Sequence, residues 1–357
     1  MTIHVSMHPF VPRPRALIAL IVLLATGAGF SLLRPEPPVE ELRMSGRTMG
    51  TTYSVKYRPT QNAPTLKALQ IEVDGLLAEI NHTMSTYDPE SELSRLNRLP
   101  TTDWVSVSDP LRAVLKAALE IGVQSEGAFD ITVGPLVNLW GFGPEFHPDR
   151  IPLERDIAAA RTRSGLDKVT LSDTQPAIRK HRPDVFLDLS GIAKGYGVDR
   201  VAELMTTHAI EHYMVEIGGE IRVRGLKEDD TPWRIAIEKP LPGERSVQTM
   251  LALSDIALAT SGNYRNFFEI AGRRYSHTID PTTGWPVDNH LVSVTVLADT
   301  SMRADAWATA FQVLGPERGM AIAERINLPV LFVIERDGQF EERVCCAFQR
   351  YRRQELS

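Results

Sequence analysis

Apolar and polar positions along the chain follow a helical period in some segments and alternate in others. Residues 66–84 carry apolar side chains at helical spacing, which predicts an amphipathic helix. A second helix is predicted over residues 111–126, where Asp109 and Pro110 supply an N-cap followed by a first-turn proline. Three further helices are predicted at residues 157–164, 193–208 and 302–314.

Strands are predicted where apolar and polar residues alternate, or where a short apolar run is bounded by turn residues. These segments are residues 49–57, 185–189, 213–217, 220–225, 233–238, 248–253, 291–297 and 330–334. Helices and mostly hairpin-linked strands are therefore mixed along the chain. We expect an α+β fold with mixed or antiparallel sheets and flanking helices.

The first 34 residues have a different character from the rest of the chain. Arg13 and Arg15 precede an uncharged apolar stretch over residues 16–33, near the lower limit for crossing a bilayer. This pattern is typical of a signal peptide or signal anchor over residues 1–34, with a buried helix as the alternative. No cysteine follows the stretch, which excludes a lipid-anchored cysteine. With basic residues before the span, the positive-inside rule places the later chain outside.

The remaining chain divides into a spacer, a folded part and a short tail. Residues 35–40 contain three prolines and form a stiff spacer. A folded domain is predicted over residues 41–350, followed by a basic tail over residues 351–357 that we interpret as a solvated end. We therefore expect the folded part to lie outside a membrane and to be held there by the N-terminal segment.

Composition limits the possible functions. The 357 residues include 43% hydrophobic and 24% charged residues and carry a net charge of −6, an ordinary globular balance. No long basic stripe lies outside the termini, so binding to nucleic acid is not expected. The only cysteines, Cys345 and Cys346, are adjacent, and vicinal cysteines rarely form a disulfide. They also lack the partners that a zinc site needs.

A glycine-rich segment around an aromatic residue is the first candidate for chemistry. Residues 127–136 read GAFDITVGPL, and residues 140–143 read WGFG. Glycines in such a segment allow the backbone to approach a flat ligand closely. An ordinary turn over a core explains the same pattern and stays open.

A second candidate is a glycine turn that leads into the predicted helix at residues 193–208. Residues 187–197 read LDLSGIAKGYG. Such a turn directs backbone N–H groups and the positive end of the helix dipole at an anion, and Lys194 could contact a phosphate. The segment matches neither the dinucleotide fingerprint nor the P-loop. An ordinary strand-to-helix connection remains the alternative.

Two short polar segments form the third candidate. Residues 260–265 read TSGNYR, and residues 276–284 read SHTIDPTTG. His277 could accept a proton near neutral pH, and Thr278 and Asp280 are close to it in sequence. A purely structural histidine is the alternative.

The fourth candidate is a carboxylate and a hydroxyl on the predicted helix at residues 302–314. Asp305 and Thr309 are four residues apart and project from the same face. A carboxylate and a hydroxyl, completed by backbone carbonyls and phosphate oxygens, suit a hard cation such as Mg²⁺. The flanking alanines and Trp307 suggest a buried face, where an unpaired aspartate is costly. A surface Asp with an ordinary Thr is the alternative.

Together these segments resemble the ApbE-type FAD:protein FMN transferases, a family earlier labelled as thiamine biosynthesis lipoproteins. The resemblance extends from about Met49 to Phe348. The matching segments, in family order, are MGTTY at residues 49–53, STYD at 85–88, DITVGPL at 130–136, DLSGIAKG at 188–195, VEIGGE at 215–220, TSGNY at 260–264, HTIDP at 277–281 and ADAWAT at 304–309.

The resemblance implies a two-lobed α+β fold that binds FAD between its lobes. By matching motif, flavin contacts are expected from Met49, Tyr87, Ala128, Phe129, Asp130, Asp188, Lys194 and Ile279. A Mg²⁺ site is expected from Asp305, Thr309 and the backbone carbonyl of Gly191. Two departures from the family pattern qualify this: the lipid-attachment cysteine is absent, and the charge at the Lys194 position varies among relatives.

The implied reaction cleaves the FAD pyrophosphate, transfers FMN through a phosphoester to a Thr or Ser of another protein, and releases AMP. His277 is the candidate that activates or orients the hydroxyl, with Asp280 as its orienter or as a rival base. By family analogy, the acceptor is a membrane respiratory subunit of the sodium-pumping NADH:quinone reductase or Rnf type, or an exported FMN-binding domain.

Other activities are compatible with the same residues. A pyrophosphatase would split FAD into FMN and AMP with water in place of the protein hydroxyl. A non-enzymatic periplasmic flavin carrier would bind FAD without metal, which leaves the Asp305 and Thr309 pair unexplained. No residue supports a direct role in thiamine synthesis.

Overall fold

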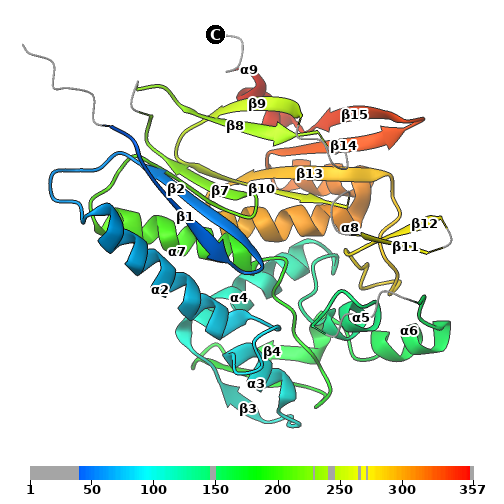
Figure 1. The fold of residues 1–357 in the computed structure, drawn as a ribbon. Coiled ribbons are helices and arrows are strands. Elements are labelled where there is room, and N and C mark those ends of the chain that lie inside the picture. Colours follow the sequence, from blue (N-terminus) through cyan, green and yellow to red (C-terminus); the bar gives the residue numbers. More distant parts are fainter. Residues whose placement is uncertain are drawn as a thin grey trace, which may run out of the picture. The chain divides into compact units, whose positions relative to one another are not determined.

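An eight-stranded sheet, in which every neighbouring pair is antiparallel, is the frame of the fold (Figure 1). The computed structural model describes residues 40–144, 150–227, 230–239, 246–263, 267–270 and 272–353, and residues 40–357 form one unit by their contacts. The strands, in their order across the sheet, are β1 (Leu42–Thr48), β2 (Thr51–Tyr57), β6 (Tyr213–Ile217), β7 (Glu220–Arg224), β10 (Ile256–Gly262), β13 (Leu291–Ala298), β14 (Val330–Arg336) and β15 (Gln339–Val344).

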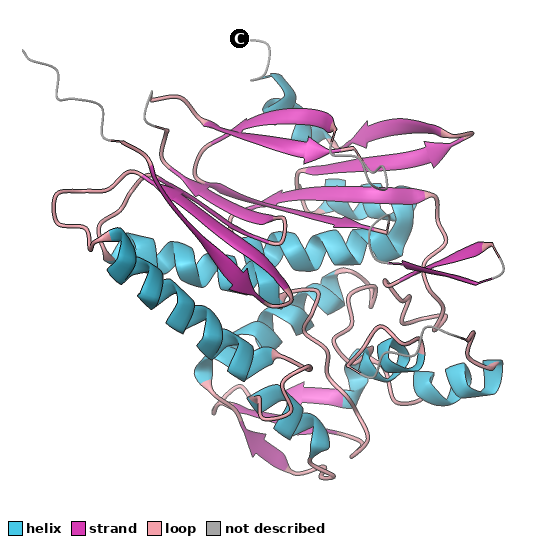
Figure 2. Ribbon diagram, viewed as in Figure 1, coloured by secondary structure: helices cyan, strands magenta, loops and turns pink. Residues whose placement is uncertain are grey.

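Helices pack against one face of this sheet (Figure 2). The first layer contains α7 (Ala193–Thr207), which contacts β6 and β7, and α8 (Ser301–Arg325), which contacts β10 and β13. Helix α2 (Leu66–Met84) packs on both β1 and α7, and α4 (Asp109–Gln124) lies behind α8. Because α7 and α8 also contact each other, the two helices fix the position of one another under the sheet.

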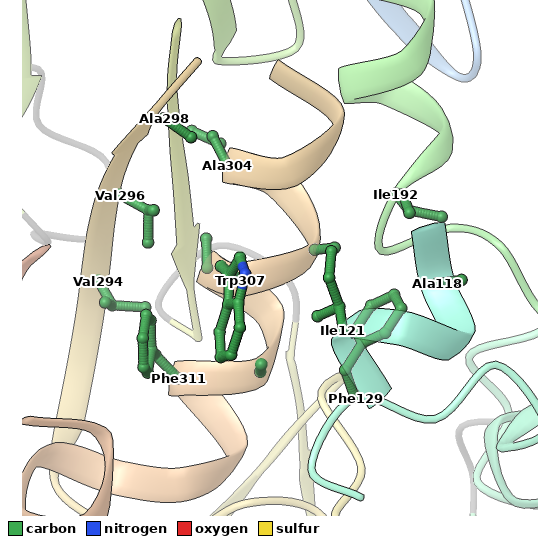
Figure 3. Packing of buried hydrophobic residues seen from close by; sticks show 14 of the residues in the cluster. Ala118, Ile121, Phe129, Ile192, Val294, Val296, Ala298, Ala304, Trp307 and Phe311 are labelled. Carbon is green, nitrogen blue, oxygen red and sulfur yellow. The ribbon is translucent and has the colours of Figure 1, made fainter. Parts of the chain in front are cut away.

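The centre of the main hydrophobic core lies around α8 (Figure 3). Trp307 and Phe311 stack with ring centroids 5.1 Å apart and are fully buried. They pack toward Val294 and Val296 on β13, while Phe129 lies on the opposite side of the helix. Burial of such large rings contributes several kcal/mol, so α8 is held firmly between the sheet and the segment that contains Phe129.

Smaller elements complete the described part of the chain. A three-stranded sheet contains β3 (Trp104–Ser106), β5 (Ala177–Lys180) and β4 (Val169–Leu171). Two hairpins pair β8 (Trp233–Glu238) with β9 (Val247–Leu253) and β11 (Phe267–Ile270) with β12 (Arg273–Ser276). The short helices are α3 (Glu92–Arg98), α5 (Gly134–Leu139), α6 (Glu154–Arg161), α9 (Gln349–Arg353) and the 3-10 turns η1 (Leu166–Lys168) and η2 (Cys346–Phe348).

The α+β class predicted from the sequence is confirmed, and most periodic segments form the predicted elements. The helix over residues 66–84 and the strands over residues 213–217 and 233–238 have the predicted bounds. The helix predicted to end at residue 314 breaks there, because Gly315 has a non-helical φ of 75° and Pro316 follows, but a second helical part continues to Arg325.

The strand predicted over residues 185–189 is wrong, because this segment joins no sheet. The Asn97 side chain donates to the Leu187 carbonyl at 2.9 Å and accepts from the Leu187 N–H at 2.8 Å. The next N–H, that of Asp188, donates to the Ile131 carbonyl at 2.7 Å. A side chain and a single loop carbonyl therefore satisfy the backbone groups that a neighbouring strand would otherwise bind.

Two predicted boundaries also need correction. The N-cap of α4 is Ser108, whose hydroxyl accepts from the Leu111 N–H at 3.3 Å, while Asp109 is already helical. Met49 does not begin a strand. Met49 and Gly50, with φ of 48° and 72°, form the two-residue turn between β1 and β2, because a tight hairpin of type I′ requires positive φ at both positions.

The terminal segments are only partly covered by the structure. The predicted signal segment over residues 1–34 and most of the spacer lie outside the described residues, so both stay predictions. Among the helices that the structure describes, none is sufficiently long and apolar to cross a membrane. Helix α9 continues to Arg353, so the predicted tail begins inside a helix. Cys345 is buried, Cys346 is exposed, and both are free.

Candidate active site

A cleft of about 1050 Å³ lies where the sheet, the glycine turn before α7 and the first half of α8 meet. This is at the upper end of the size range of small-molecule sites. Most of the residues predicted for the site line this cleft, although they come from segments far apart in the chain. They are Ala128, Phe129, Asp130, Asp188, Gly191, Lys194, His277, Ile279, Asp305 and Thr309.

Three predicted site residues lie outside the cleft lining. Met49 sits in the β1–β2 turn and points toward Gly197 of α7. Tyr87 is exposed, and its hydroxyl donates to the Phe142 carbonyl at 3.0 Å. Partial burial, and then the nearby Asp188 carboxylate, raise the pKa of the Tyr87 phenol. The third residue is Asp280.

Asp280 takes part in a local turn. Its Oδ1 accepts from the Thr282 N–H at 2.8 Å, as in an Asx turn. Among the described residues, no hydrogen bond joins its carboxylate to His277. His277 itself lines the cleft, with its ring edge toward Phe142 at a centroid distance of 6.4 Å. The geometry therefore brings His277 into the cleft and leaves Asp280 in the turn that follows it.

Lys194 lies between two buried carboxylates. Its Nζ is 2.7 Å from Oε1 of Glu220 and 3.8 Å from Oδ1 of Asp305. Burial opposes the positive charge of Lys194, but the two carboxylates outweigh it and raise the pKa of the lysine above its usual range. Burial also raises the pKa of Asp305, although Lys194 acts in the opposite direction. The ammonium group thus compensates for charges that would be costly in isolation.

Glu220 was not predicted as a site residue, although its segment was among those that carried the resemblance. It is only 3% exposed, and its Oε2 has no hydrogen-bond partner among the described residues. Burial raises its pKa to about 7 despite the neighbouring Lys194. The sequence did contain an indication, because the two consecutive glycines Gly218 and Gly219 mark a turn directly before this acidic residue.

The raised pKa of Glu220 predicts a pH-dependent stability. The folded protein keeps a proton on this group up to about pH 7, whereas the unfolded chain releases it near the usual 4.5. The stabilising contribution is therefore complete below pH 4.5 and is lost as the pH rises through 7. Across this window we expect Glu220→Gln to remove a slope of at most about 1.4 kcal/mol per pH unit from the free energy of unfolding. Urea unfolding of both proteins at several pH values measures it, and identical slopes would contradict the assignment.

Glycines allow α8 to approach the turn before α7 very closely. The Gly195 N–H donates to Oδ2 of Asp305 at 2.9 Å. A Cβ atom on Gly195 would lie only 2.3 Å from the Ser301 carbonyl oxygen, so only glycine fits there. A Cβ atom on Gly191 would lie 3.1 Å from Oγ1 of Thr309. The predicted proximity of the glycine turn, Asp305 and Thr309 is therefore present.

Asp199, another residue that the sequence did not single out, also holds α7 and α8 together. Its two carboxylate oxygens accept from the N–H groups of Ser301 and Met302, each at 2.9 Å. The guanidinium of Arg222 donates to the same carboxylate at 2.6 Å. These bonds satisfy the first backbone N–H groups of α8. They also fix the position of the start of α8 relative to α7. The position of Asp305 in the cleft follows from this arrangement.

The donor set of the predicted metal site fits a hard cation that keeps part of its coordination for a ligand. The described residues contain no group of three or more His, Cys, Asp or Glu side chains that could hold a metal by themselves. Asp305 and Thr309 nevertheless line the same cleft beside Gly191. One carboxylate, one hydroxyl and one backbone carbonyl suit Mg²⁺, which commonly takes one or two carboxylates and substrate phosphates.

Two further aspartates each accept hydrogen bonds within a local turn and also line the cleft. Oδ1 of Asp130 accepts from the N–H and hydroxyl of Thr132, at 2.8 and 2.6 Å, and burial raises its pKa. Oδ1 of Asp188 accepts from the N–H of Ser190 at 2.8 Å and from its hydroxyl. Both carboxylates thus fix loops that line the cleft.

Comparison with known proteins agrees with the motifs. A model of the ApbE family matches residues 49–332. An FAD:protein FMN transferase of Vibrio cholerae is 48% identical over 329 residues, which cover 92% of this chain and 98% of that protein. One of Haemophilus influenzae is 42% identical over 92% of this chain and 96% of its own length. The solved structure of flavin transferase ApbE from Vibrio cholerae, 48% identical, superposes with a TM-score of 0.83 over 88% of this chain and 100% of that one. The chain therefore belongs to the ApbE family.

Proposed function

We propose that this protein is an FAD:protein FMN transferase, which moves FMN from FAD to a Thr or Ser hydroxyl of another protein and releases AMP. The observation that carries the proposal is the single cleft that brings together the glycine turn before α7, the Asp305 and Thr309 pair, and His277. Phosphoryl transfer needs these components: donors for the phosphates, a place for a cation, and a group that accepts the hydroxyl proton. Relatives that bear this activity in their names align over nearly the whole chain.

The phosphates of FAD are assigned to the glycine turn and Lys194. The turn ends at the N-terminus of α7, where the positive end of the helix dipole favours an anion. Mg²⁺ held by Asp305, Thr309 and the Gly191 carbonyl would supply charge compensation for the pyrophosphate. Lys194 would hold the buried carboxyl groups of Asp305 and Glu220 in place and so preserve the shape of the site.

His277 is assigned as the group that accepts the proton of the attacking hydroxyl. It lines the cleft together with Thr278 and Ile279, whereas the Asp280 carboxylate is used in its own turn. A neutral imidazole near pH 7 has the proton affinity that this step requires. The flavin is assigned to the part of the cleft around Phe129, Asp130 and Asp188, whose lining combines an aromatic ring with two carboxylates.

The acceptor and the location follow from the N-terminal sequence and from family analogy. We propose that residues 1–34 hold the folded part at the periplasmic side of a bacterial inner membrane. The acceptor would then be a membrane respiratory subunit of the sodium-pumping NADH:quinone reductase or Rnf type, or an exported FMN-binding domain. Limited proteolysis of intact cells and of spheroplasts tests this placement, and protection of the folded part in spheroplasts would contradict it.

A product analysis separates transfer from the two alternatives. The full chain is incubated with FAD and Mg²⁺, with and without an exported FMN-binding domain that carries a Thr acceptor, and AMP, FMN and flavinylated protein are quantified. Transfer predicts AMP in equal amount to flavinylated acceptor. AMP and free FMN at the same rate without acceptor would indicate the pyrophosphatase, and tight FAD binding without turnover would indicate the carrier.

A further inference from the structure

The terminal strand of the large sheet presents a row of exposed polar side chains. β1 is the first strand in the sheet order and pairs only with β2 among the described strands. Along it, Arg43, Ser45 and Arg47 are exposed, whereas Met44 and Thr48 are buried. Because side chains alternate along a strand, these three project from the face of the sheet that the helices do not cover.

Positive charges on this hairpin are placed unfavourably for stability. In the pairing of β1 with β2, Arg43 lies directly opposite Lys56, and like charges in such pairs are destabilising. No described carboxylate forms an ion pair with Arg43, Arg47 or Lys56, although acidic residues outnumber basic ones in the chain. The strand pairing thus gives these charges no favourable neighbour on the hairpin itself. Like charges that weaken a hairpin and have no ion-pair partner within the fold are typical of a binding surface.

This basic surface is continuous with the active site. Arg43, Ser45 and Arg47 line the same cleft as Lys194 and Asp305. Polar residues of the first two strands, Thr52 and Ser54 among them, line the same cleft. The hydroxyl of Ser54 is buried and has no partner among the described residues. A polypeptide that lies here could therefore find both charge complementarity and hydrogen-bonding groups.

We propose that the basic face of the β1–β2 hairpin (Arg43, Arg47 and Lys56, the basic hairpin face) docks an acidic segment of the acceptor protein next to its target hydroxyl. The inference rests on the proposed function, because it needs a protein substrate that enters the cleft. Positive charges at a cleft rim attract an acidic partner and set its orientation. A small, uncharged substrate such as water requires no such surface.

Peptide binding tests the docking surface independently of catalysis. The probes are fluorescent peptides with a central Thr and flanks that are acidic, neutral or basic. Their binding to the full chain is measured by fluorescence anisotropy at low and high salt. We expect the acidic peptide to bind best and to weaken with salt. In the variant that combines Arg43→Glu and Arg47→Glu we expect its affinity to fall about tenfold or more, because a change of about 1.4 kcal/mol is tenfold.

A charge-matched control variant separates a local effect from a change of net charge. Lys67→Glu with Lys116→Glu changes the charge equally on α2 and α4, where both lysines are exposed. Equal weakening in both variants would overturn the proposal, as would equal binding of the acidic and neutral peptides. FAD affinity is measured in parallel. A loss of FAD affinity as large as the loss of peptide affinity would assign the arginines to FAD and overturn the proposal.

Three further results distinguish this proposal from others. If Arg43→Glu with Arg47→Glu reduces binding to vesicles of anionic phospholipid but not to the acidic peptide, the face binds membrane and the proposal is wrong. If the wild-type chain binds the acidic peptide through this face but never flavinylates any acceptor, the proposed function fails while the docking surface stands. If the variant with Arg43→Glu and Arg47→Glu flavinylates acceptors with the same KM as the wild type, the docking surface fails and the proposed function stands.

Discussion

Replacing His277 by alanine is expected to slow FMN transfer about 10²- to 10⁴-fold, the usual contribution of a general base. The side chain lines the cleft that contains Lys194 and Asp305, so it can reach a hydroxyl that approaches the pyrophosphate. FAD affinity should change little, because the groups assigned to the phosphates lie elsewhere in the cleft. The measurements are single-turnover transfer rates and an FAD titration with the full chain.

Two control variants make the His277 prediction specific. His181→Ala removes an exposed histidine whose ring is bonded to Thr170, and it should transfer at the wild-type rate. Asp280→Asn should cost much less than His277→Ala, because the Asp280 carboxylate is engaged with Thr282. A larger loss in Asp280→Asn than in His277→Ala would make Asp280 the base. Transfer by His277→Ala at nearly the wild-type rate would contradict the assignment.

Replacing Asp305 by asparagine is expected to reduce transfer about 10²- to 10³-fold, the cost of removing one group that stabilises developing charge. An amide oxygen can still accept the Gly195 N–H, so the contact between α7 and α8 should survive. The negative charge that a cation needs is lost. Lys194 keeps Glu220 as its partner, so a large loss of stability is not expected.

The dependence of the rate on Mg²⁺ concentration distinguishes a metal ligand from a structural residue. In Asp305→Asn we expect the concentration for half-maximal rate to rise strongly, whereas Asp173→Asn, at an exposed position, should match the wild type. Thermal unfolding of the apo proteins is measured alongside. A variant that loses activity but keeps the wild-type Mg²⁺ dependence would show that Asp305 acts in another way.

Local sequence patterns predicted the elements in which buried residues recur at regular helical or strand spacing. The helix over residues 66–84 buries Leu69, Val73, Leu77 and Ile80 at helical spacing, so its bounds were correct. The segment over residues 185–189 has the apolar character of a strand, but Asn97, which is distant in sequence, takes the hydrogen bonds. No local pattern contains that information, because it depends on where α3 packs.

Which residues line the cleft could be predicted from the sequence to a similar extent, and for similar reasons. Gly191, Lys194, Asp305 and Thr309 stand in local motifs with a chemical logic of their own, and the fold brings them together. The roles of Glu220 and Asp199 depend on contacts between separate elements: the first lies beside Lys194, and the second binds the start of α8. Such contacts become visible only once the helices and strands are placed.

The most direct test of the central claim is the intact mass of an acceptor domain after incubation with the full chain, FAD and Mg²⁺. The account predicts a mass increase of one FMN residue on a Thr or Ser, located by peptide mapping, and AMP released in equal amount. It also predicts that the increase disappears with EDTA and in Asp305→Asn. An unmodified acceptor, with FAD split to free FMN and AMP by the same cleft, would contradict the claim and make the protein a pyrophosphatase.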